Sequence, residues 1–455
     1  MTYEDTFANE TLLQELSESF RAHNQIPEAL FSRYGIKRGL RNADGTGVLV
    51  GASWLGNVHG YIVNEGEREP IEGRLTYRGY DVYDLIRGLE AENRFGFGEI
   101  GYLLMCGALP TRRQLSDFQA MIGQERALPN NFTEDMIMRA PSRDIMNKLA
   151  GATLALYSYD QNPDETTVEN VMRQGISLMA KFPVIISHAY QAKRRYFDGD
   201  SMYLHMPDPA RSTAENILHL IRPDGSYTDD EAKLLDRCLI LHAEHGGGNN
   251  SSFTVRVATS SGTDTYSAIA AAVSALKGPR HGGANLRVVR MLDEIKANVG
   301  DWSDEDEVAA YLRKIMDGQA GDGSGLIYGM GHAVYTLSDP RAVALKEAAR
   351  PLAERKGFSR EMAMIELVEK LTPAVFNEKK KLDKPMCANV DLYSGFVYKL
   401  LGLPESLYTP LFATARIVGW MAHRLEELTT GGKIIRPAYK PLGKAMEYRN
   451  LDERE

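Results

Sequence analysis

Apolar residues recur at spacings of three and four along most of the chain, which is the pattern of amphipathic α-helices. From residue 83 to about residue 191 this pattern comes in successive helix-length segments. Four prolines interrupt it, and they predict the breaks between helices: Pro110, Pro129, Pro141 and Pro163. Residues 1–45 predict one or two amphipathic helices and a polar segment, whereas residues 193–226 predict loops with at most a short helix.

Residues 47–82 differ from the rest because they are rich in β-branched and aromatic residues and are punctuated by glycine. A few short strands fit this stretch and almost no other. The chain is therefore expected to be all-α, with a few short strands near its N-terminus.

Local signals fix several helix ends. Thr228 and Glu231 form a capping box that opens a helix running to about Ala243, before the glycines at 246–248. Thr263 or Asp264 opens the next helix, which Gly278 and Pro279 end. The segments 284–297, 392–401 and 410–428 are further predicted helices, and another starts with Pro340 at its first position.

The stretch from Leu239 to Leu292 concentrates titratable groups beside flexible backbone. It holds three of the ten histidines, His242, His245 and His281, and two of them adjoin glycine runs. Glycine lets a ligand come close to the backbone, so the stretch suits a binding site. Two tight turns that happen to carry histidines would give the same pattern, and the stretch alone does not separate the two interpretations.

Composition narrows the class of protein. Hydrophobic residues make up 43% and charged residues 25%, as in ordinary globular proteins, and the length suggests two or three domains. The net charge of −8 argues against general binding to nucleic acid or membrane surfaces. The three cysteines are far apart, and the acidic start of the chain resembles neither a secretory signal nor a transit peptide, so a cytoplasmic location is expected.

Three arginines are candidates for binding an anionic substrate. Arg341 lies in the first turn of its helix, where a bound carboxylate would offset the unfavourable helix dipole. A solvated arginine paired with Asp339 or Glu347 is the alternative. Arg416 shares an apolar helix face with Phe412, and is expected to be partly buried and paired; Arg436 follows two isoleucines. Three arginines would suit a substrate with two carboxylates.

Asp391 precedes a predicted helix, where it can serve simply as the N-cap. A role as general base would require a pKa raised toward neutrality. Backbone amides at an N-cap lower the pKa of a carboxylate, so the two roles conflict. The residues alone leave this conflict open.

His281 precedes two glycines and His332 follows one, and His281 lies near the start of the 284–297 helix, where the dipole favours a neutral imidazole. A neutral histidine can donate a hydrogen bond to a developing enolate. A metal enzyme was the alternative class, because His242 and His245 would share one helix face around Glu244. However, no metal-binding signature is present, and a helix C-terminus opposes metal binding by raising the pKa of a histidine.

Six segments, taken in order, resemble the successive motifs of the citrate synthase family: HAEHGGGNNSS, GPRHGGAN, GMGHAVYTLSDPRA, NVDLYSG, FATARIVGWMAHRLEE and KIIRPAY. An earlier segment, TYRGYDVYDLI, resembles the family's strand-to-helix signature, so the resemblance covers about residues 60–440. It implies a two-domain helical subunit that works as a dimer or larger assembly. The large domain would comprise residues 1–281, with an N-terminal extension at 1–45, and 391–455, and the small domain residues 282–390.

The resemblance also implies a reaction and a set of roles. Acetyl-CoA would condense with oxaloacetate and water to give citrate, without a metal or a bound prosthetic group. Asp391 would be the base, His281 would stabilise the enol or enolate, and His332 would polarise the oxaloacetate carbonyl. The carboxylates would be held by His245, Arg341, Arg416 and Arg436 of the partner subunit. Phe412 would pack at the site, and the backbone of Ile327, Gly329 and Gly331 would contact CoA.

One feature departs from the family pattern, and the choice of acyl-CoA substrate is not decided by the motifs. Glu244 and the glycines at 246–248 differ from the commoner form of the first motif, which puts the geometry of the His245 loop in doubt. Related enzymes use propionyl-CoA to make 2-methylcitrate with the same catalytic residues, and one methylene is a weak basis for discrimination. An inactive relative that binds CoA or a dicarboxylate is the remaining alternative.

Overall fold

The computed structural model describes residues 9–42, 44–64, 67–381 and 385–454. These residues fall into two compact units, one from Met1–Ala52 with Arg436–Glu455 and the other from Ser53–Ile435. The first unit contains α1 (Glu10–His23), which Asn9 caps by accepting the Leu12 amide hydrogen, and α2 (Glu28–Arg33). These two helices confirm the prediction for residues 1–45, of which residues 1–8 and 43 lie outside the described residues.

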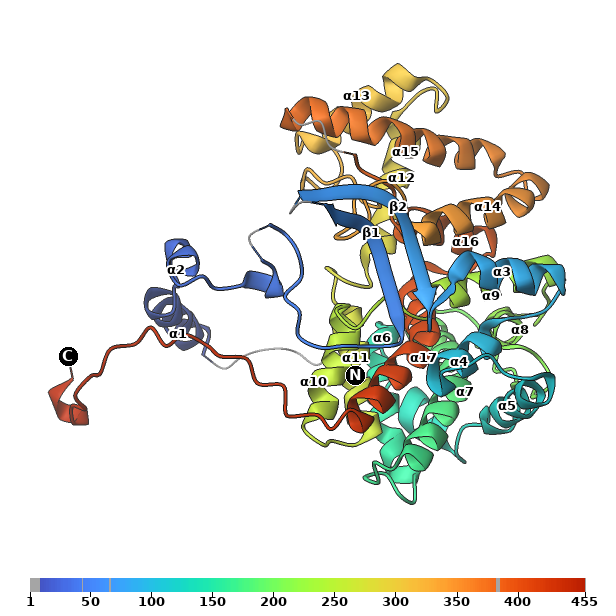
Figure 1. Cartoon of the computed structure of the whole chain (residues 1–455), viewed down its shortest axis with the longest axis horizontal. Helices are drawn as coiled ribbons and strands as arrows, with labels where there is room; N and C mark the ends of the chain where they lie inside the picture. Colours follow the sequence, from blue (N-terminus) through green and yellow to red (C-terminus); the bar gives the residue numbers. More distant parts are fainter. Residues whose placement is uncertain (1–8, 43, 65–66, 382–384, 455) are drawn as a thin grey trace. The chain divides into compact units, whose positions relative to one another are not determined.

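The second unit is built mainly of helices with one small sheet, which confirms the all-α prediction (Figure 1). Its strands are β1 (Gly56–Asn64), β2 (Glu67–Tyr77) and β3 (Tyr80–Asp81). Its first helices are α3 (Val82–Ala91), α4 (Phe97–Cys106), α5 (Arg112–Glu125), α6 (Ile145–Leu156), α7 (Val168–Lys193), α8 (Thr213–Ile221) and α9 (Asp229–His242). The later ones are α10 (Asn250–Ser260), α11 (Thr265–Lys277), α12 (Ala284–Asn298), α13 (Glu305–Met316), α14 (Pro340–Arg355), α15 (Ser359–Lys380), α16 (Val390–Leu400) and α17 (Tyr408–Thr429).

The helix ends follow the capping signals of the sequence. Thr228 and Glu231 form the predicted capping box of α9, Asp264 caps α11, and Pro340 is the first residue of α14 behind the cap Asp339. Because α9 ends at His242, His245 does not share a helix face with it, contrary to the expectation from their spacing. The boundaries of the small domain stay a prediction. No helix among the described residues is long and apolar enough to cross a membrane.

Helix α17 is the centre of the second unit. From Tyr408 to Glu426 nearly every residue is buried, and the helix packs against α4, α7, α9, α10 and α11 (Figure 1). A helix that is buried on all sides is apolar around its whole circumference. Arg416 and Arg424 are therefore exceptions that need a reason, since both are completely buried.

The antiparallel pair β1 and β2 packs against the loop that leads into α14. Gly73 on β2 makes this approach possible, because a Cβ atom there would lie 2.0 Å from the Ser338 carbonyl oxygen. The Gly73 amide donates to the Ser338 hydroxyl over 3.0 Å. The hairpin thereby holds the segment from His332 to Ser338, which carries candidate site residues.

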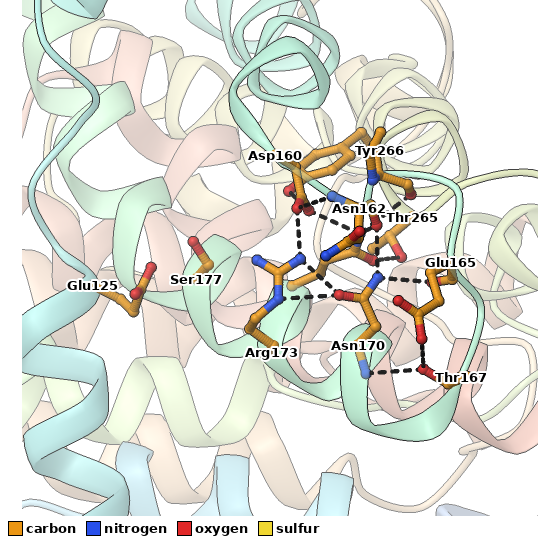
Figure 2. A network of polar contacts seen from close by, with 12 residues as sticks. Glu125, Asp160, Asn162, Glu165, Thr167, Asn170, Arg173, Ser177, Thr265 and Tyr266 are labelled. Atoms are coloured by element: carbon orange, nitrogen blue, oxygen red, sulfur yellow. Dashed lines mark hydrogen bonds and ion pairs between the residues drawn. The ribbon is translucent and has the colours of Figure 1, made fainter.

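A polar network joins the start of α7 to the start of α11 (Figure 2). Asp160 lies at its centre and accepts hydrogen bonds from the Tyr266 hydroxyl (2.7 Å), Arg173 (2.6 Å) and Gln174 (2.9 Å). Burial alone would raise the pKa of Asp160, but these bonds and the Asn162 amide lower it to about 2. The carboxylate is therefore stabilised in its ionised form.

We expect Asp160→Asn to lower the melting temperature at neutral pH by about 2–4 °C, because the ionised hydrogen bonds are lost. The folded-state pKa lies below the ordinary value of 3.8, so this stabilisation is complete above 3.8 and disappears as the pH falls through about 2. Thermal unfolding measured along an acid series checks both points. Asp230→Asn, which breaks an exposed pair with Arg355, is the control and should have little effect. Equal melting temperatures for Asp160→Asn and wild type at neutral pH would contradict the analysis.

Candidate active site

Two of the predicted histidines meet although they are far apart in the sequence. The rings of His245 and His332 are in edge-to-face contact, with centroids 5.2 Å apart. The Tyr335 ring stacks on the His332 ring with centroids 4.6 Å apart, and it makes an edge contact with the His245 ring with centroids 5.7 Å apart. Gly246, with a φ of 84°, turns the chain directly after His245.

The hydrogen bonds of His332 define its tautomer. Its Nδ1 atom accepts the backbone amide hydrogens of Val334 and Tyr335, each at 3.1 Å. A nitrogen that accepts hydrogen bonds carries no proton, so the neutral ring has its proton on Nε2. His332 is therefore arranged to donate a hydrogen bond from Nε2.

His281 has the opposite tautomer. Its Nε2 atom accepts the Ser251 amide hydrogen at 3.3 Å and lies 3.1 Å from the Ser251 hydroxyl, which also accepts a hydrogen bond from Trp420. The proton of the neutral ring is thus on Nδ1. Burial, aided by the charge of Arg416, lowers the pKa of His281 to about 4, so the ring is neutral at pH 7. This agrees with the expected neutral histidine, although burial rather than the helix dipole is the main cause.

Arg416 is completely buried on α17. Its Nε atom donates to the His242 carbonyl oxygen over 2.6 Å, and its guanidinium lies 4.8 Å from the Phe412 ring centre. Both terminal nitrogens, Nη1 and Nη2, lack a hydrogen-bond partner in the described part of the chain. Burial lowers the pKa of Arg416 to about 10, which leaves it charged at pH 7. The expectation that Arg416 is buried is confirmed, but the expectation of a paired side chain is wrong.

Arg341 is buried at the start of α14. Its guanidinium forms two hydrogen bonds with Asp339, of 3.0 and 2.7 Å. Burial opposes the charge of Arg341, but Asp339 more than compensates and raises its pKa. The alternative from the sequence named the right partner, but Arg341 is not solvated. Arg436 is exposed in the other compact unit, and its expected contribution from a neighbouring subunit stays a prediction.

Asp391 is not the N-cap of its helix, which corrects the interpretation from the sequence. Asn389 caps α16, and its side chain accepts the Asp391 amide hydrogen at 3.0 Å. The carboxyl group of Asp391 is therefore released from capping. Burial raises its pKa to about 6, with Asp339 acting in the same direction and Arg341 and Arg416 opposing. The conflict between cap and base does not arise.

A short backbone pairing brings the His332 and Asp391 segments together. The Gly331 amide donates to Cys387 and the Asn389 amide to Gly329, both over 2.8 Å. The Asn389 side chain also donates to the Gly331 carbonyl oxygen over 2.9 Å. Gly329 is buried and Ile327 half-buried on this segment, but their predicted contact with CoA stays a prediction.

The charges of two buried arginines act on several of these residues. The charge of Arg416 perturbs the pKa values of His245, His281 and Asp391. Arg341 acts on His245 and Asp391 as well. Burial is the main reason that the pKa of His245 lies well below its ordinary value. These groups therefore comprise neutral imidazoles, a half-buried carboxyl group with a raised pKa and charged guanidinium groups.

Reasoning from the sequence missed the role of His242 in this arrangement. Its ring lies 4.4 Å from that of Phe412, and both of its nitrogens lack hydrogen-bond partners among the described residues. Its pKa lies well below the ordinary value because of burial and the nearby charges of Arg341 and Arg416. The sequence places His242 in a stretch that suits a binding site and weighs it as a metal ligand, but it gives His242 no role in binding substrate.

Cavities lie beside the site and elsewhere. A cavity of about 480 Å³ is lined by His281 and Arg280 together with Asn250 and the turn at 278–279. A larger cavity of about 590 Å³ lies between α5 and α8, and none of the candidate site residues lines it. The chemistry of the residues, rather than cavity size, therefore identifies the site.

A helical protein with neutral imidazoles, a half-buried carboxyl group of raised pKa and guanidinium groups has the composition of an acid–base site for an anionic substrate. The comparisons with known proteins are more specific. Residues 46–438 match the family profile described as "Citrate synthase, C-terminal domain". The chain belongs to the citrate synthase family of condensing enzymes.

Named relatives fall into two groups. A citrate synthase of Corynebacterium glutamicum is 35% identical over 84% of this chain and 83% of its own length. 2-Methylcitrate synthase 2 of the same organism is 32% identical over 85% of this chain and 91% of its own. The solved citrate synthase of Thermoplasma acidophilum, in a ternary complex with carboxymethyl coenzyme A and oxaloacetate, has a TM-score of 0.74 at 26% identity, covering 92% of this chain and 99% of that one.

The raised pKa of Asp391 predicts a stability penalty. Its folded-state value of about 6 lies above the ordinary 3.8, so the folded protein loses stability as the pH rises through about 6. We therefore expect the melting temperature of Asp391→Asn, relative to wild type, to increase between about pH 4 and pH 8. Differential scanning calorimetry at several pH values measures this change. A constant difference across the range would show that the carboxyl group is not destabilised by burial.

Proposed function

We propose that the protein is a citrate synthase, which condenses acetyl-CoA with oxaloacetate and water to give citrate and CoA. The observation that carries this proposal is that the Asp391 carboxyl group, whose pKa is raised, and the neutral His281 are both affected by the charge of Arg416, while backbone hydrogen bonds join the His332 segment to the Asp391 segment. The family membership and the relatives named citrate synthase support it. The proposed reaction needs no metal or prosthetic group, and acetyl-CoA is a co-substrate.

In the proposed mechanism the carboxylate of Asp391 removes a proton from the methyl group of acetyl-CoA. The Nδ1 proton of His281 donates a hydrogen bond to the thioester oxygen and stabilises the enol or enolate. The new carbon–carbon bond forms when the former methyl carbon of the enol or enolate attacks the keto carbon of oxaloacetate. The keto oxygen accepts a hydrogen bond from Nε2 of His332. Water then cleaves the thioester of citryl-CoA and releases citrate and CoA.

The proposed binding groups for oxaloacetate are cationic or donate hydrogen bonds. The free terminal nitrogens of Arg416 would bind one carboxylate, and two parallel hydrogen bonds from a guanidinium group are a strong arrangement for that ligand. Arg341, His245 and Arg436 of the partner subunit would complete the set, with Phe412 packing beside it. A homodimer in the cytoplasm is the corresponding proposal for assembly and location. We propose that the cavity at His281 binds the thioester end of acetyl-CoA. The backbone at 327–331 would contact its nucleotide end.

Relatives named 2-methylcitrate synthase support a second candidate, in which propionyl-CoA is the acyl donor. We expect release of free thiol from acetyl-CoA that depends on oxaloacetate, with a higher kcat/KM than for propionyl-CoA. The reverse preference would identify a 2-methylcitrate synthase. Absence of thiol release from either thioester would overturn both activities and leave a binding protein.

Asp391→Asn should lower kcat by about 10²–10⁴-fold, because the base is lost while the shape of the residue is kept. In the wild type, kcat/KM should rise with pH through about 6, since the carboxyl group must be ionised to accept a proton. Thiol release followed across a pH series measures both effects. Asp230→Asn, which lies on the surface, is the matched control. Wild-type turnover in Asp391→Asn would exclude this role.

A further inference from the structure

Glu244 is a buried carboxylate next in the chain to His245, a candidate substrate-binding residue. It is completely buried, and its Oε1 atom accepts the Gly246 amide hydrogen at 2.5 Å and a hydrogen bond from His423 Nε2 at 2.9 Å. Its other oxygen, Oε2, is buried without a hydrogen-bond partner in the described part of the chain. Burial opposes its charge, but His423 and Arg416 compensate and lower its pKa, so Glu244 is ionised.

His423 is fixed in one orientation by a second arginine. Nδ1 of His423 accepts from Arg256 Nη2 at 2.8 Å and from Nε at 3.1 Å. Arginine has only donors, so Nδ1 carries no proton and the proton on Nε2 must point to Glu244. Arg256 is itself held by ion pairs with Glu426 and Glu427. Glu426 in turn accepts the Trp54 amide hydrogen at 2.8 Å, so the arrangement is anchored on three segments of the chain.

Glu244 and Arg416 have opposite charges and influence each other, yet they form no ion pair within the described structure. Glu244 raises the pKa of Arg416, and Arg416 lowers that of Glu244. Three buried atoms remain without partners: Oε2 of Glu244 and both terminal nitrogens of Arg416. Buried charges normally pair, because an unpaired one is costly. Some restraint therefore keeps these two groups from joining.

Gly419 shows how closely the two segments approach. It lies three residues after Arg416, on the same side of α17. A Cβ atom at Gly419 would lie 2.3 Å from the Ala243 carbonyl oxygen and 2.6 Å from Oε2 of Glu244. The carboxylate is thus pressed against the helix that carries Arg416. Its hydrogen bonds to His423 and Gly246 set which way it faces.

We propose that His423, held by Arg256, is a positioning residue that restrains Glu244, so that Glu244 balances the charge of Arg416 without occupying its terminal N–H groups. The guanidinium then stays charged in a buried site and stays open to a substrate carboxylate. This inference rests on the proposed function only in taking a dicarboxylate as the ligand of Arg416.

The test is a rescue experiment on oxaloacetate binding by isothermal titration calorimetry. His423→Leu removes the hydrogen bond, so Glu244 is free to pair with Arg416 and compete with the ligand. The Kd for oxaloacetate should rise about tenfold, as expected for one additional ion pair that must be broken. Where turnover is measured, the rise should appear mainly in KM for oxaloacetate rather than in kcat.

Adding Glu244→Gln to His423→Leu removes the competing charge and should return the Kd to within about twofold of wild type. If His423 serves only to fill space, the double variant should bind no better than His423→Leu, and that result overturns the proposal. An unchanged Kd in His423→Leu overturns it as well. Melting temperatures of all variants show whether any loss of affinity reflects unfolding instead.

Glu244→Gln alone decides the question if His423→Leu fails to fold. The amide keeps the size and the acceptor oxygen but not the charge, so oxaloacetate should bind at least as tightly as to wild type. Weaker binding by this variant, or no binding by the wild type, overturns the proposal. A different result would overturn the proposed condensation and leave the inference on His423 intact. In that case the wild type binds oxaloacetate but releases no thiol from acetyl-CoA or propionyl-CoA.

Discussion

A charged guanidinium, buried in α17 with both terminal nitrogens lacking a hydrogen-bond partner among the described residues, is the constraint on which the site depends. Arg416 has lost its contact with water, and only its Nε atom has a hydrogen-bond partner among the described residues. Such a group is costly in a folded protein unless another charge stabilises it. Two neighbours stabilise the charge of Arg416: the carboxylate of Glu244 and the face of the Phe412 ring. A bound anionic ligand would stabilise it further. Stability is given up where binding requires it.

Burial explains the protonation states of the histidines near Arg416, and the arginine charges add to its effect. Burial disfavours the imidazolium form of His242, His245 and His281, and the arginine charges disfavour it further. Neutral rings can be hydrogen-bond donors at one nitrogen and acceptors at the other. Backbone amides then select the tautomer, since His332 accepts at Nδ1 and His281 at Nε2. Two identical side chains thus present different nitrogens to the site.

Asp391 illustrates how one neighbouring residue changes the chemistry of another. Asn389 takes the capping position of α16, so the cap does not engage the Asp391 carboxylate. Burial therefore raises the pKa of Asp391 although the charges of Arg341 and Arg416 oppose it, whereas the carboxylate of Asp160 is held ionised by several donors. The two aspartates differ in their surroundings and not in their chemistry.

The amino-acid sequence by itself determined the helices and their ends, because periodicity and capping are local properties. Thr228, Asp264 and Pro340 begin helices where the capping rules place them. The ordered motifs also predicted the family and the helical fold, since each motif keeps residue types that a site needs at fixed spacing. The roles assigned to individual site residues stay predictions.

Only the tertiary structure decided the state of the site residues. The cap of α16 lies two residues before Asp391, a difference smaller than the precision of helix boundaries predicted from sequence. The hydrogen bond from Arg416 to His242 and that from His423 to Glu244 each join residues more than 170 positions apart in the chain. Such contacts form when α9 and α17 pack together, and no local pattern in either segment records them.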